Sequence, residues 1–276
     1  MTFKVDFNII RDSIKIGFPA LIKTPSSYLL GNIEKFFLQY FIGPLQLGLF
    51  NHGSNYKNYQ DVLGKSFNRV YGADFIEKYT KNEFDIKRHA WLGVRWLSMN
   101  FLLSLGIVLF IGNFIDILTH GKFIQSRIIA ELMFVATYVQ CINTFYSQII
   151  VVEKKTKFIA SSSLFIGIIS TLAVIFGILK YGWVGAVLGA LVGAMLSPLI
   201  TVLKVRQLIG YTFLIKEHMI FLSLIVIAFV LRQQLDSVLG LDILIILIAI
   251  YVLISISFTW RLNLLSLMLK KQKTLT

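Results

Sequence analysis

The sequence predicts an all-α, polytopic integral membrane bundle of about eight transmembrane helices. Hydrophobic residues make up 56% of the 276 residues, and the mean hydropathy is +0.74. Apolar stretches recur along the chain, and each is long enough to cross a bilayer core about 30 Å thick. Such segments satisfy their backbone hydrogen bonds internally as helices, and they lack the strict alternation of barrel strands.

The predicted spans follow one another with short connections. They cover residues 14–41, 45–67, 91–114, 128–152, 158–179, 183–203, 218–235 and 241–260. We expect one membrane domain over residues 1–276, with a core six-helix bundle at 14–210 and two additional peripheral helices at 218–260.

Lysine and arginine residues divide unequally between the two sides that these spans define. One side collects most of the cations outside the spans, in segments near residues 4–15, 69–88, 154–157, 204–216 and 261–273. The other side holds Lys122, Arg127 and Lys180. Because cytoplasmic loops are enriched in cations, both termini are expected in the cytoplasm.

The span at 45–67 is the most polar of the eight, and it has an alternative interpretation as a helix lying on the membrane surface. That alternative would move the cations at 69–88 to the outside and invert every later loop. Eight spans therefore explain the charge distribution more simply.

The first two spans carry ionisable residues where hydrocarbon would penalise them, which is typical of a water-filled cavity. Lys23, Ser27 and Glu34 share one face of the first span, since they lie four and seven residues apart. Pro19 and Pro25 flank Lys23 and should bend the helix there.

The second span gathers its polar side chains into one arc that includes Asn51, Asn58 and Asp61, and Lys57 can pair with Asp61 at i+4. An inert internal pairing of Lys57 with Asp61 is the alternative to a functional cavity. The candidate substrate-binding residues are Lys23, Glu34, Asn51, Lys57, Asn58 and Asp61.

The later spans are interpreted as scaffold. Gly185, Gly189 and Gly193 recur every four residues and should let a neighbouring helix approach closely. Gln140, Asn143 and Gln148 either line the same cavity or join helices by hydrogen bonds. Arg232, near the outer end of its span, is expected to extend to the membrane surface.

No motif indicates an enzyme. The chain lacks a phosphate-binding glycine loop, metal-ligand spacings and a large outward loop, so we expect no catalytic residue, cofactor or metal. The single cysteine, Cys141, lies in a span and offers no disulfide. The first dozen residues lack a cleavable signal peptide. We expect membrane lipids as partners and no nucleic acid.

Two segments resemble the second half of bacterial polysaccharide flippases, the O-antigen and capsule members of the multidrug/oligosaccharidyl-lipid/polysaccharide exporter superfamily. The first runs from Ser13 to Tyr59, and its similar elements are Gly17-Phe18-Pro19, Glu34-Lys35 and Gly48-Leu49-Phe50. The second runs from Glu153 to Ile200 and contains the Tyr-Gly-x-x-Gly-Ala element at 181–186. The resemblance covers roughly residues 12–210.

The resemblance implies a location in the cytoplasmic (inner) membrane of a bacterium and transport of an undecaprenyl-pyrophosphate-linked oligosaccharide across it by alternating access. It also implies that the chain is half of a transporter, either truncated or paired with an N-terminal half polypeptide. Lys23 and Lys57 would contact the pyrophosphate. The alternatives are a drug or cation antiporter of the same superfamily and an inactive structural membrane fragment.

Overall fold

The computed structural model describes residues 32–81, 83, 86–210 and 215–235, and the regular structure of these residues is helical. The α-helices are α2 (Ile33–Phe41), α3 (Pro44–Asn55), α4 (Lys57–Thr80), α5 (Ile86–Thr119), α6 (Arg127–Val152), α7 (Thr156–Ile209) and α8 (Ile215–Leu235). A short 3₁₀ helix, η1 (Ile124–Ser126), precedes α6. The all-α prediction is confirmed for these residues.

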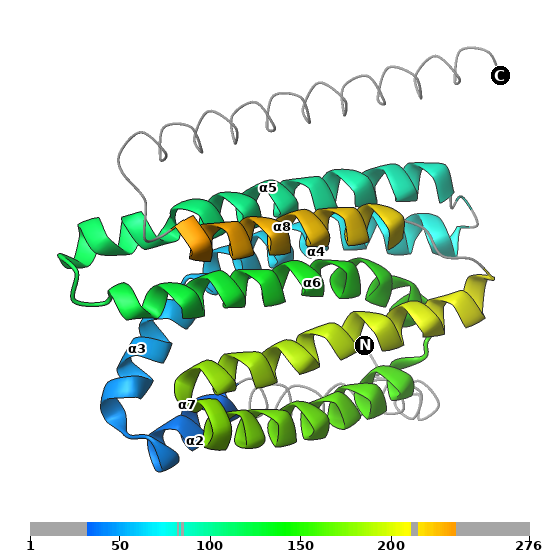
Figure 1. Ribbon diagram of the computed structural model, residues 1–276. Coiled ribbons are helices and arrows are strands. Elements are labelled where there is room, and N and C mark those ends of the chain that lie inside the picture. The colour runs from blue at the N-terminus through cyan, green and yellow to red at the C-terminus, as the bar shows by residue number, and fades with distance from the viewer. Residues whose placement is uncertain (1–31, 82, 84–85, 211–214, 236–276) are drawn as a thin grey trace, which may run out of the picture.

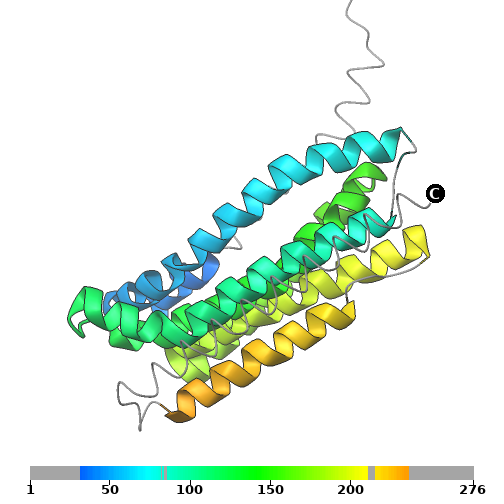
Figure 2. The same ribbon diagram turned by 90° about the horizontal axis from the view of Figure 1, so that it is seen from above.

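Helix α6 is the centre of the bundle. It packs against α3, α4, α5, α7 and α8, and Figures 1 and 2 show the long helices running side by side around it. Its side chains are buried along most of its length, including Tyr138 and Tyr146, which are fully buried. A helix that is apolar and buried on nearly all sides belongs to the interior of a bundle.

Three helices are long and apolar enough to cross a membrane within the described residues: Arg88–Thr119, Ile124–Val152 and Thr156–Ile209. The predicted count of eight is therefore not reached. Part of the difference is in α7, which is a hairpin broken at Gly182 (φ 63°, ψ −140°), so that the predicted spans 158–179 and 183–203 are its two arms. The span at 241–260 and the part of the first span before residue 32 lie outside the described residues.

The prediction of one continuous helix over 45–67 is wrong. Helix α3 ends at Asn55, and a separate helix, α4, starts at Lys57 and continues to Thr80. Gly53, Ser54 and Asn55 are weak helix formers, which explains why the helix ends there. Neither α3 nor α4 qualifies as an apolar span.

The glycine spacing on the second arm of α7 has the predicted packing role, and the helix that approaches is the first arm of the same hairpin. A Cβ atom placed on Gly185 would lie 1.9 Å from the carbonyl oxygen of Gly177, and one on Gly189 would lie 2.5 Å from the Cα of Val174. The two backbones therefore meet at a distance that only glycine allows at these positions.

The connections alternate between the two ends of the bundle, as the charge argument assumed. The C-terminal end of α4, the α6–α7 turn and the C-terminal end of α7 lie at one end, and the α2–α3, α5–α6 and Gly182 turns lie at the other (Figure 1). Lys154 and Lys155 lie in connections at the first end, and Lys122 and Lys180 are close to turns at the second.

We predict that Gly185→Ala destabilises the bundle by about 1–3 kcal/mol, because the new methyl group meets a backbone oxygen that cannot move aside. Thermal unfolding of the detergent-purified protein measures the change. Gly48→Ala is the matched control, since nothing lies within 4 Å of a Cβ at that position. Equal stability of the two variants would contradict the tight hairpin.

Candidate functional site

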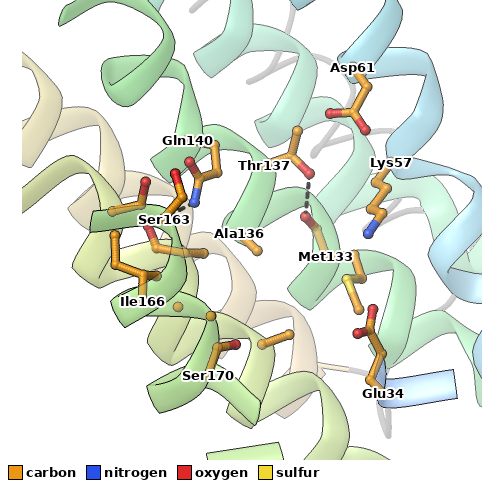
Figure 3. Close-up of a pocket in the computed structure, with 15 residues that line it drawn as sticks. Glu34, Lys57, Asp61, Met133, Ala136, Thr137, Gln140, Ser163, Ile166 and Ser170 are labelled. Carbon is orange, nitrogen blue, oxygen red and sulfur yellow. Dashed lines mark hydrogen bonds between the residues drawn. The ribbon is translucent and has the colours of Figure 1, made fainter. Parts of the chain in front are cut away.

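A cavity of about 450 Å³ lies between α2, α4, α6 and both arms of α7 (Figure 3). Its charged lining residues are Glu34, Lys57 and Asp61. The neutral polar groups come from α6 and α7, and small residues leave the space open. These neutral lining residues are Met133, Ala136, Thr137, Gln140, Ser163, Ile166, Gly167, Ser170, Ala190, Gly193, Ala194 and Ser197.

Two helices, α2 and α4, place the three charged side chains at the cavity. Glu34 lies in the first turn of α2, which packs against α7, and its side chain is buried. Lys57 and Asp61 lie one turn apart at the start of α4, so they share a helix face. Figure 3 shows the Lys57 ammonium group directed toward the Glu34 carboxylate, with the Asp61 carboxylate on its other side.

The charged lining therefore places one cation between two anions. With all three groups ionised, two carboxylates and one ammonium give the described lining a net charge of −1. The four ion pairs within the described residues do not include Lys57 or Asp61. The Lys57 ammonium instead lies close enough to both carboxylates to interact with them electrostatically, and all three groups face the cavity.

Helix α6 supplies amide side chains that both line the cavity and join the helices. The Gln140 amide donates to the carbonyl oxygen of Ala194 (3.2 Å), and the Asn143 amide donates to the Gln140 side chain (3.2 Å). Thr201 donates to Asn143 (2.6 Å). Both alternatives considered for these residues are thus realised: Gln140 lines the cavity, whereas Asn143 joins helices.

A second cavity of about 200 Å³ continues along α4 and shares Asp61, Thr137 and Gln140 with the first. Its other lining residues are Gln60, Gly64, Lys65, Asn68, Trp96, Cys141 and Thr144. Beside it, the Gln148 amide donates to Asn68 across α6 and α4 (2.7 Å). Asp61 therefore lines both cavities, which adjoin along α4.

The structure brings together three of the six residues predicted to bind substrate. Glu34, Lys57 and Asp61 line the larger cavity, but Asn51 is half-buried and Asn58 is exposed, and neither lines the two cavities described above. The break at Tyr56 ends the helix on which Asn51 and Asp61 were expected to share a face. Lys23 lies outside the described residues.

A buried ionic network that was not predicted from the sequence joins α5, α6 and α8. Glu131 is fully buried, its carboxylate lies 2.9 Å from Arg127 Nε, and it accepts a hydrogen bond from Gln233 (2.6 Å). Arg232 donates to Asn113 (2.9 Å) and is only 4% exposed. The expectation that Arg232 extends to the membrane surface is therefore wrong.

A sequence signal for this network did exist. Glu131 follows Arg127 by four residues at the start of a predicted span, which is the spacing of an intrahelical ion pair. Its third and fourth partners could not be foreseen, because Asn113 and Gln233 are brought close only by the packing of α5 and α8 against α6.

No protein-family model, curated protein or solved structure matches this chain significantly. Function must therefore be inferred from the chemistry of the site. Within the described part of the chain, no three His, Cys, Asp or Glu side chains gather closely enough to hold a metal ion. The groups that a ligand would meet are an ammonium, carboxylates, amides and hydroxyls.

We predict that Glu131→Ala lowers the stability of the bundle by about 3–5 kcal/mol, because it leaves the Arg127 guanidinium in the bundle without its carboxylate. Chemical or thermal unfolding in detergent measures the loss. Glu77→Ala is the control, since Glu77 pairs with Lys81 on the exposed surface of α4 and should change stability little. A comparable loss in both variants would contradict the structural role of the buried network.

Proposed function

We propose that this chain forms part of a bacterial polysaccharide flippase, which moves an undecaprenyl-pyrophosphate-linked oligosaccharide across the cytoplasmic membrane. The observation that supports the proposal is a cavity inside the helical bundle whose lining includes the Lys57 ammonium group on one wall and hydroxyl and amide groups of α6 and α7 on the others. The sequence resemblance to this transporter class agrees with it. We further propose that both termini face the cytoplasm, where the more basic end of the bundle would lie.

The division between polar interior and apolar exterior suits an amphiphilic substrate. The cavity offers hydroxyls and amides for sugars, including those of Ser163, Ser170 and Gln140. The outer faces of α7 expose large apolar side chains such as Leu172 and Leu199. A polyprenyl tail can thus remain among the lipids while the head group occupies the cavity.

The Lys57 ammonium group is proposed to contact the pyrophosphate, because charge-assisted hydrogen bonds favour a phosphate oxygen as partner. Lys23 is proposed to join it from the first span. Glu34 and Asp61 would hold the lysine in position and would be displaced or neutralised when the anion binds. Alternating access requires a second bundle to move against, which we propose is contributed by another polypeptide segment.

One observation favours a second candidate, a drug or cation antiporter of the same superfamily. The described charged lining has a net charge of −1 with Glu34, Lys57 and Asp61 ionised, which attracts a cation more readily than an anion. The two candidates make opposite predictions for the removal of a carboxylate charge.

Binding of the two ligand classes to the purified chain in nanodiscs separates the candidates without requiring transport. We predict that Lys57→Ala weakens binding of the lipid-linked oligosaccharide about 10–100-fold, the loss expected for one hydrogen bond to a charged group. Lys180→Ala is the matched control, because Lys180 is exposed and packs over Phe176 outside the cavity. Unchanged binding in Lys57→Ala would contradict the proposed contact.

For Asp61→Asn we predict binding of the lipid-linked oligosaccharide that is unchanged or tighter, because the substitution removes a negative charge from the cavity and keeps its shape. Binding of a cationic dye to the same variant serves as the comparison. If the wild-type chain binds the dye and not the lipid, and Asp61→Asn abolishes dye binding, the antiporter is the correct assignment.

A further inference from the structure

Five cations lie in the turn between α6 and α7, in the first turn of α7 and in its last turns, and we name this set the basic corner. Its members are Lys154, Lys155, Lys157, Lys204 and Arg206. Lys204 is half-buried, and the other four side chains are exposed. Neither cavity includes any of them, so they take no part in the substrate contacts proposed above.

The backbone of the turn places a lysine where glycine is the usual residue. Lys154 has φ 54°, in the left-handed region, and the amide of Lys155 donates to the carbonyl oxygen of Ile150 (3.1 Å). This pattern is a Schellman motif, whose left-handed position strongly favours glycine. A lysine at this position therefore brings a positive charge into the turn against the local conformational preference.

The second arm of α7 adds its cations to the same surface. The Lys204 ammonium group lies 5.3 Å from the centre of the Phe158 ring, and it donates to Gln207 (3.2 Å). Phe158 directly follows Lys157 at the start of the first arm, so this contact places Lys204 against the segment that carries Lys157.

The acidic residue next to the turn, Glu153, offsets at most one of the five positive charges. Glu153 precedes the turn, and its carboxylate accepts a hydrogen bond from the Tyr79 hydroxyl on α4. The four ion pairs of the described residues involve none of the five cations. The corner thus keeps an excess of positive charge that faces outward.

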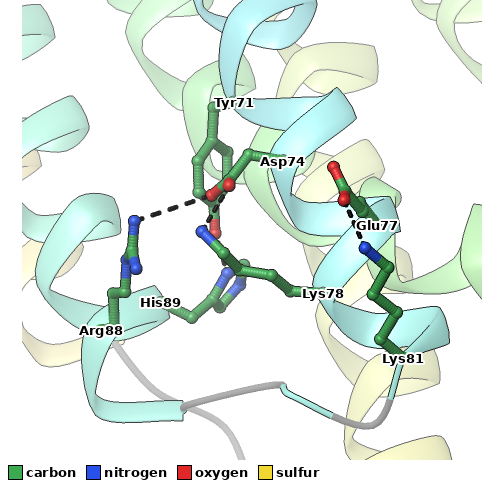
Figure 4. Close-up of polar contacts among 7 residues, drawn as sticks. All are labelled: Tyr71, Asp74, Glu77, Lys78, Lys81, Arg88 and His89. Atoms are coloured by element: carbon green, nitrogen blue, oxygen red, sulfur yellow. Dashed lines mark hydrogen bonds and ion pairs between the residues drawn. The ribbon is translucent and has the colours of Figure 1, made fainter.

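The neighbouring α4–α5 end provides a contrast within the same molecule. There Asp74 pairs with Lys78 and lies 3.9 Å from Arg88, and Glu77 pairs with Lys81 at 2.6 Å (Figure 4). The hydrogen bond from Lys81 lowers the pKa of the exposed Glu77 carboxyl. Positive charge at this end of the bundle is therefore compensated in one place and left uncompensated at the basic corner.

Exposed apolar side chains continue from the corner along the same helices. Val151, Leu199 and Leu203 are each about half exposed, at 45%, 56% and 52%. A ligand with a charged head and hydrocarbon chains would meet cations at the corner and apolar surface beside it. A free phosphate ion would use only the cations.

We propose that the basic corner binds the phosphate of an anionic phospholipid from the surrounding leaflet, with the acyl chains along the exposed face of α7. Basic clusters next to membrane-spanning helices bind such head groups, and each cation near an anionic surface strengthens binding about fivefold. The site requires only that α6 and α7 are embedded in a bilayer, so it stands or fails independently of the proposed transport function.

The test measures phosphatidylglycerol retained by the full chain in detergent, by native mass spectrometry, with phosphatidylcholine and inorganic phosphate as the other ligands. The test variant combines Lys154→Gly, Lys155→Gln and Lys157→Gln, which suits the left-handed turn and removes three charges. The control variant combines Lys78→Gln, Lys81→Gln and Arg88→Gln, which removes three charges from the compensated end. We expect at least tenfold weaker retention of phosphatidylglycerol in the test variant and less than threefold in the control.

Three outcomes would overturn the proposal. Equal losses in both variants would show a general effect of net charge, and equal retention of phosphatidylcholine would show that the head-group charge is irrelevant. Displacement of the lipid by submillimolar inorganic phosphate would identify a site for a soluble anion. If the triple variant does not purify as a folded protein, Lys155→Gln and Lys157→Gln are measured singly, and about fivefold weaker retention in each is the expected result.

Discussion

Burial in an apolar helical bundle penalises a charged side chain that has no polar partner, and this constraint explains how the described bundle arranges its buried ionisable groups. Glu34, Lys57 and Asp61 turn toward one cavity, and Arg127 and Glu131 turn toward each other between α5, α6 and α8. The first arrangement leaves space for a ligand, whereas the second fills its space with protein partners. The same physical requirement therefore produces a binding site in one place and a structural contact in the other.

Close packing of the α7 hairpin and open space in the cavity come from the same small side chains. Gly185 and Gly189 let the two arms touch at the backbone, and Gly193 and Ala190 farther along the same arm line the cavity. Larger residues on this face would separate the arms at one level and fill the cavity at another. The position of the cavity wall formed by α7 is thus set by the close packing of its two arms, where the contacting residues are uncharged.

The sequence was sufficient where the signal is local. Hydropathy located the helices that became α5, α6 and the two arms of α7, and the spacing of Lys57 and Asp61 placed both side chains on one face. The break at Tyr56 is not predictable from hydropathy, because the polar sequence of residues 45–67 is compatible with one continuous helix. Asn51 and Asn58 were assigned to the site on that assumption, and the structure does not place them there.

Contacts between segments that are distant in the chain could not be predicted from the sequence, for a different reason. Glu34 meets Lys57 only because α2 packs against α7 while α4 packs against α6, and Gln233 reaches Glu131 only because α8 lies against α6. Such pairs depend on how whole helices cross, and neither hydropathy nor local spacing predicts these crossings. The glycine spacing predicted close packing correctly but could not identify the partner helix.

The most direct measurement asks whether the cavity holds water within the bilayer. A chain with Cys141→Ala, which removes the only cysteine, would carry either Ser170→Cys in the cavity wall or Leu172→Cys on the exposed apolar face of the same arm. In proteoliposomes, we predict that a hydrophilic thiol reagent labels the cysteine at 170 and spares the one at 172. Labelling at 172 but not at 170 would contradict a hydrated site enclosed by α2, α4, α6 and α7.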